Sequence, residues 1–174
     1  MASSPFDTEK AVEAITSLPF AEPQAKAARD LLQYLSENFA APVPMLSGAQ
    51  CVIAVDSGLD CLLEFLPKLV PPNWQSKTIT RLCNRLSDVV KLLRESSPAV
   101  LVIISNLFVQ TGAEGISALV AVSPETRYLV MTGFESFIAD FQQVSECVHV
   151  PIHTIMMPFS GDEFRAALTG LSAA

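Results

Sequence analysis

The chain has 174 residues, of which half are hydrophobic and only 17% are charged, so we expect a sizeable buried core. Its formal net charge of −7 disfavours direct binding to nucleic acid, because recognition of a phosphate backbone needs a basic surface that releases counterions. The four cysteines stand far apart and include no CxxC pair, and only two histidines, His149 and His153, could complete a metal site, so we expect neither a metal nor another cofactor.

The first residues contain no basic segment followed by an apolar stretch, and no uninterrupted apolar run reaches 18 residues. Such features mark secretory leaders and membrane-spanning helices. We therefore expect a cytoplasmic protein that does not insert into a membrane.

Residues 1–48 carry helical signals without strand-like apolar runs. Asp7 or Thr8 can cap a short helix that ends near Leu18, and Pro23 stands in the first turn of a second, amphipathic helix. The apolar stripe of this second helix packs either on its own domain or on a second copy of the chain. The sequence APVPMLSG at 41–48 then predicts a linker. We therefore divide the chain into a helical extension with linker, 1–48, and a domain, 49–174.

The domain alternates strand-length apolar runs with helical patterns. The runs cover 51–56, 78–83, 100–105, 127–133 and 151–159, and the helical patterns cover 57–69, 86–96, 114–122, 136–147 and 161–171. Continuous apolar strands are buried on both faces when crossover helices cover a parallel sheet. This pattern predicts an α/β domain with a doubly wound five-stranded parallel sheet in the flavodoxin-like order 2-1-3-4-5.

In such a sheet, the functional site lies beyond the carboxyl ends of the strands. The residues that the sequence places there are Asp56, Ser57, Ser105, Asn106, Thr132, Gly133, Met157 and Pro158.

Two motifs in the last third of the chain resemble the receiver domains of two-component response regulators. VMTGFES, at 130–136, is similar to the end of the family's fourth strand, where a hydroxyl residue stands before a small neighbour. IMMPFSGDEFRAAL, at 155–168, is similar to the end of the fifth strand, where a lysine precedes a proline that is typically cis. The resemblance implies a CheY-like fold and a role in bacterial signal transduction.

Set against the family pattern, this chain lacks the groups that accept a phosphoryl group. Of the two adjacent acids that hold magnesium in the family, only Asp56 is present, followed by Ser57. The acceptor aspartate would fall at Ile104 or Ser105, and the lysine corresponds to Met157. Thr154 replaces the switch aromatic. The resemblance therefore implies a degenerate phosphoacceptor pocket, in which Asp56 either binds a ligand or caps the following helix.

These observations predict a pseudo-receiver that works without phosphorylation as a protein-interaction adaptor, and not as an enzyme. By resemblance to the way receivers dimerise, we expect a homodimer. The expected interaction face consists of Phe134, Phe137, Phe141, Phe164 and Arg165. Phe137 and Phe141 are four positions apart and share one helix face, for which packing in the core is the alternative. The alternative hypothesis is a small-molecule sensor that uses the emptied pocket.

Overall fold

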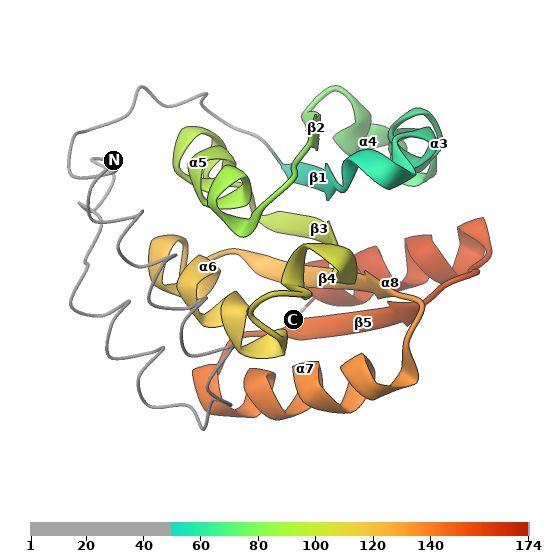
Figure 1. Ribbon diagram of the computed structural model, residues 1–174. Helices are drawn as coiled ribbons and strands as arrows, with labels where there is room; N and C mark the ends of the chain where they lie inside the picture. The colour runs from blue at the N-terminus through green and yellow to red at the C-terminus, as the bar shows by residue number, and fades with distance from the viewer. Residues whose placement is uncertain (1–49, 174) are drawn as a thin grey trace.

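The computed structural model describes residues 50–173, which Figure 1 draws in colour. The predictions for the extension, including its two helices and the linker, lie outside the described residues. The described part begins one residue before the first strand, at Gln50, whose backbone N–H donates to the carbonyl of Lys77 over 2.9 Å.

Five parallel strands form one sheet in the order β2-β1-β3-β4-β5, which confirms the predicted fold class. The strands are β1 (Cys51–Val55), β2 (Thr78–Leu82), β3 (Val100–Ile104), β4 (Arg127–Thr132) and β5 (Ile152–Met156). The helices are η1 (Ser57–Leu59), α3 (Cys61–Leu69), α4 (Pro72–Gln75), α5 (Leu86–Ser96), η2 (Ser105–Phe108), η3 (Ala113–Gly115), α6 (Ile116–Val122), α7 (Glu135–Val148) and α8 (Gly161–Ala173).

The helices cover the sheet in two layers. Helices α5, α6 and α7 contact one another in succession on one side, and α3 contacts α8 on the other. Every residue of β1 and β3 is buried, as their continuous apolar sequences predict for strands with helices on both faces. The edge strand β2 is different, because its last two residues are exposed.

The four-residue helix α4 lies outside the predicted elements, because residues 70–77 were assigned to neither a helix nor a strand. Proline is well accommodated at the start of a helix, where its missing N–H has no intrahelical partner. Pro72 is the first residue of α4, and the helix buries Trp74 to 8% exposure. The tryptophan therefore covers the edge of the core and is not an exposed anchor.

Among the described residues, no helix combines the length and the apolar character that crossing a bilayer requires.

Candidate functional site

The carboxyl ends of β1, β3, β4 and β5 carry the side chains that the sequence predicted for the site. We call Asp56, Ser105, Thr132 and Met157 the strand-end rim. Each follows or ends its strand directly, since β1 ends at Val55, β3 at Ile104, β4 at Thr132 and β5 at Met156. Because all strands are parallel, their carboxyl ends lie at one edge of the sheet.

Asp56 acts as the N-cap of η1. Its Oδ1 accepts a hydrogen bond from the N–H of Gly58 over 2.6 Å. A β-carbon at Gly58 would stand 3.1 Å from this oxygen, so the tight turn suits glycine. Ser57, in the position of the second metal acid, is exposed. One carboxylate that is already engaged by its own turn offers little to a divalent cation.

Ser105 begins the 3-10 turn η2 directly after β3 and is completely buried. Within the described part of the chain, its hydroxyl has no hydrogen-bond partner. A buried hydroxyl without a partner loses its solvation and gains nothing in return, which costs about 1–3 kcal/mol. No carboxylate stands at either position predicted for the phosphoacceptor, Ile104 or Ser105.

Thr132 ends β4 and is also completely buried, but its hydroxyl is used twice. It accepts from the N–H of Phe134 over 3.1 Å and donates to the carbonyl of Phe134 over 3.3 Å. The hydroxyl therefore fixes the turn that leads into α7. Gly133 has open space where a β-carbon would lie.

Met157 and Pro158 end the fifth strand with a cis peptide bond. The backbone N–H of Met157 donates to the carbonyl of Thr132 over 2.7 Å, which links this turn to the end of β4. The half-buried Met157 side chain packs against the core and has no charge with which to hold a phosphoryl group. Pro158 is exposed.

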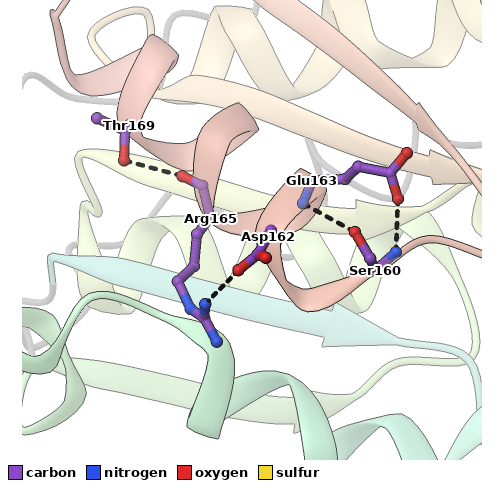
Figure 2. A network of polar contacts seen from close by, with 5 residues as sticks. All are labelled: Ser160, Asp162, Glu163, Arg165 and Thr169. Carbon is purple, nitrogen blue, oxygen red and sulfur yellow. Dashed lines mark hydrogen bonds and ion pairs between the residues drawn. The ribbon is translucent and has the colours of Figure 1, made fainter.

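The turn after Pro158 closes in a capping box at the start of α8 (Figure 2). Ser160 N–H donates to Glu163 Oε2 over 2.6 Å, and Glu163 N–H donates to Ser160 Oγ over 3.2 Å. The backbone bond from Ser160, followed by its hydroxyl, lowers the pKa of the Glu163 carboxyl. The two reciprocal bonds therefore fix the start of α8.

No group of three or more potential metal ligands occurs among the residues that the structure describes. Cys83 lies next to the rim, since its N–H donates to the carbonyl of Val55 over 2.9 Å, but burial raises the pKa of its thiol to about 12. A thiol that stays protonated is a poor nucleophile. His153 is the second residue of β5, about three residues, or roughly 10 Å, before the carboxyl edge.

The expected interaction face is divided by burial. Phe141 and Phe164 are completely buried, so their prediction as surface residues is wrong. Phe164 stacks on Phe159 at a ring distance of 5.5 Å, and both belong to the turn and first residues of α8. Arg165 is exposed and pairs with Asp162 over 2.8 Å (Figure 2).

Phe141 instead belongs to a row of aromatic rings that leads from the surface into the core. Phe134, 56% exposed, contacts Phe137 at 6.2 Å between ring centroids. Phe137 stacks on Phe141 at 5.7 Å, and Phe141 meets the buried Phe108 edge-on at 5.0 Å. We call Phe134, Phe137, Phe141 and Phe108 the aromatic row. The spacing of the first three residues indicates one helix face, but Phe108 comes from η2 and no sequence signal pointed to it.

The strand order and the strand-end turns define an α/β domain of the receiver type. The domain is similar to the chemotaxis response regulator CheY4 of Vibrio cholerae, with a TM-score of 0.53 and 16% sequence identity over 71% of this chain and 99% of that chain. A second structure of that protein, crystallised at pH 4.0, gives a TM-score of 0.51 and 16% identity over 72% of this chain and 98% of that chain. No protein-family model and no curated protein matches the sequence. The described domain thus has the receiver fold.

Proposed function

We propose that this domain is a pseudo-receiver that works without phosphorylation, as a protein-interaction adaptor in bacterial signalling. The observation that carries the proposal is the pairing of neutral side chains at two positions of the rim. Ser105 stands where the receiver family has its phosphoacceptor aspartate, and it has no carboxylate. Met157 stands where the family has its lysine, and it has no positive charge. Aspartyl phosphorylation needs an ionised carboxylate as attacking group, and a serine hydroxyl needs a base beside it.

The proposal includes the absence of catalytic activity. Fold alone does not assign chemistry, so the argument rests on the rim. The Asp56 carboxylate caps its own turn, and the Thr132 hydroxyl is bonded to the backbone of Phe134. Burial holds the pKa of the neighbouring Cys83 thiol well above its ordinary value. These groups support a structural role better than proton transfer or nucleophilic attack.

A thermal-unfolding experiment tests the independence from phosphorylation. The full chain is heated with magnesium alone, with magnesium and acetyl phosphate, and with magnesium and beryllium fluoride, beside an active receiver domain as positive control. We expect the melting temperature of this chain to stay unchanged while that of the control rises, because a ligand stabilises only a fold that binds it. A rise in the melting temperature of this chain with either acetyl phosphate or beryllium fluoride would refute the proposal.

The adaptor role predicts a protein partner, and we expect Phe134 to contact it. A large exposed aromatic ring beside a rigid helix start is a typical anchor for a partner. Phe134→Ala should weaken affinity capture of the partner, whereas Phe65→Ala, which removes a ring of similar exposure (52% against 56%), should not. Equal capture by both variants would remove Phe134 from the interface.

One observation favours the sensor hypothesis as a second candidate. The buried Ser105 hydroxyl lacks a partner among the described residues, and a bound small molecule would supply one. Native mass spectrometry of the purified full chain tests this idea. An added mass that disappears in Ser105→Ala supports a sensor, and a spectrum without added mass in both proteins contradicts it.

A further inference from the structure

The charged residues of the domain are separated along the sheet. Six of the eight basic residues that follow Gln50 lie between Lys68 and Arg94, a stretch that runs from the end of α3 through α5. The stretch from Glu114 to Glu163 holds seven acids and one basic residue, Arg127. Figure 1 places β2 and α5 at one end of the sheet and β5 and α7 at the other. Because the first part of the domain also holds five acids, residues 50–112 are close to neutral and residues 113–173 are acidic. The cations of the first part matter only where they gather locally, around β2.

The β2 end of the sheet has a strand edge that no described strand pairs with. β2 is the terminal strand of the described sheet and pairs there only with β1. Lys77, Arg81 and Arg85 are exposed around it, and Leu82 is exposed to 49% between the two arginines. Among the described residues none of these three cations forms an ion pair, although the Arg81 guanidinium donates to the carbonyl of Thr80. We call Lys77, Arg81, Leu82 and Arg85 the basic edge.

The other end of the sheet also combines exposed apolar side chains with charges of one sign. Val109 and Phe134 are exposed to 71% and 56%, and Glu135 and Asp140 are exposed on α7. Helix α7 contains three acids and no basic residue. The ring contact between Phe108 and Phe141 places the turn that bears Val109 beside α7. We call Val109, Phe134, Glu135 and Asp140 the acidic face.

These two surfaces determine how two copies of the chain can meet. A two-fold symmetric contact places the same patch of both copies face to face. Joining two acidic faces would bring the acids Glu135 and Asp140 of both copies together. Joining two basic edges would bring the cations Arg81 and Arg85 of both copies together. Like charges across an interface oppose association, whereas the acidic face and the basic edge have complementary charge. Each surface also has exposed apolar side chains, Val109 and Phe134 on the acidic face and Leu82 on the basic edge.

We propose that copies of this chain associate head to tail, with the acidic face of one copy docked on the basic edge of the next. Phe134 and Leu82 form the apolar centre of the contact, and the cations meet Glu135 and Asp140 around it. This arrangement differs from the two-fold homodimer that the receiver resemblance implies. It does not depend on the state of the phosphoacceptor pocket, so it can fail or succeed separately from independence of phosphorylation. It shares Phe134 with the proposed adaptor surface, and charge changes that keep Phe134 separate the two.

A charge-swap experiment on the full chain tests this contact by sedimentation velocity at about 0.05 M and about 0.5 M salt, where screening differs strongly. One variant carries Arg81→Glu and Arg85→Glu, and the other carries Glu135→Lys and Asp140→Lys. We expect wild-type mass to rise with concentration at low salt, and each variant alone to associate about tenfold more weakly. An equal mixture of the two variants should regain association, because each unlike pair is restored. Glu125→Lys, an exposed acid outside both surfaces, is the matched control and should behave as wild type.

Several results would overturn the proposal. These are a wild-type chain that stays monomeric, a mass that saturates at two copies and does not respond to salt, and variants that associate as wild type does. Loss of association in both variants without recovery in the mixture would assign these surfaces to other partners and refute the contact between copies. If a charge reversal impairs folding, as judged by circular dichroism, Arg81→Gln with Arg85→Gln and Glu135→Gln with Asp140→Gln replace it, each expected to weaken association in the same direction.

Discussion

The strand-end rim and the aromatic row are neighbours that meet at Thr132 and Phe134, yet their side chains are used in opposite ways. The polar groups of the rim are engaged by their own turns or buried, as Asp56 and Ser105 illustrate. The aromatic row begins with an exposed ring and ends in the core. The difference teaches that the exposed aromatic side chain of this region lies at the start of α7, beside the strand ends and not at them.

The largest expected effect separates the two ends of the aromatic row. Phe141→Ala should lower the free energy of unfolding by about 3–5 kcal/mol, because it leaves a cavity among rings that pack from both sides. Phe134→Ala should change it by no more than about 0.5 kcal/mol, since the ring is mainly in solvent. Urea unfolding of both variants measures the difference. Similar losses of unfolding free energy in the two variants would mean that Phe134 is also part of the core, so that no ring of the aromatic row is exposed in solution.

The comparison also shows how far the sequence leads. Strand positions and α5 (Leu86–Ser96) followed from apolar runs and periodicity, because burial on both faces leaves a strong local signal. The sequence left open whether Phe141 packs in the core. The burial of Phe164 was missed, although Phe164, Leu168 and Leu171 share one helix face and are all buried. Resemblance to a dimer surface was given more weight there than periodicity.

The candidate site was predictable in its residues but not in its contacts. Strand ends placed Asp56, Ser105, Thr132 and Met157 correctly at one edge. Whether Asp56 binds a ligand or caps a turn depends on one backbone N–H, that of Gly58, and both readings fit the same sequence. Similarly, the two hydrogen bonds between the Thr132 hydroxyl and the backbone of Phe134 depend on a turn geometry that composition does not encode.

The second prediction tests the link between the rim and the row. Thr132→Val keeps the shape of the side chain but leaves the N–H and carbonyl of Phe134 without this hydroxyl, so it should lower the free energy of unfolding by about 1–2 kcal/mol. Thr132→Ser retains the hydroxyl and serves as the control. Hydrogen exchange at the Phe134 amide should become faster in the valine variant only. Unchanged exchange would show that the turn is held by other contacts.

The third prediction contrasts the two buried hydroxyls of the rim. Ser105→Ala should raise the free energy of unfolding by about 1 kcal/mol or leave it unchanged, because the lost hydroxyl has no partner among the described residues. The opposite signs expected for Ser105→Ala and Thr132→Val, both measured by urea unfolding, distinguish an unused polar group from a used one. A loss above about 1 kcal/mol in the alanine variant would mean that Ser105 has a hydrogen-bond partner in solution.

The smallest expected effect concerns the turn that closes the β5 end of the rim. The Ser160 backbone N–H, followed by the Ser160 hydroxyl, lowers the pKa of the exposed Glu163 carboxyl below its ordinary value of 4.5. A carboxyl whose pKa is lower in the folded state stabilises the fold above its unfolded-state pKa, and the contribution is lost as the pH falls through the folded-state pKa. Glu163→Gln cannot titrate, so the difference in urea midpoint between wild type and variant should be constant near neutral pH. It should shrink as the pH falls below about 4.5. Glu125→Gln, an exposed acid away from this turn, is the control for a general loss of charge. A difference that stays constant down to pH values near 3 would show that the capping box does not depend on the ionised carboxylate, and that the β5 turn is held by the backbone and by the Phe159–Phe164 stack.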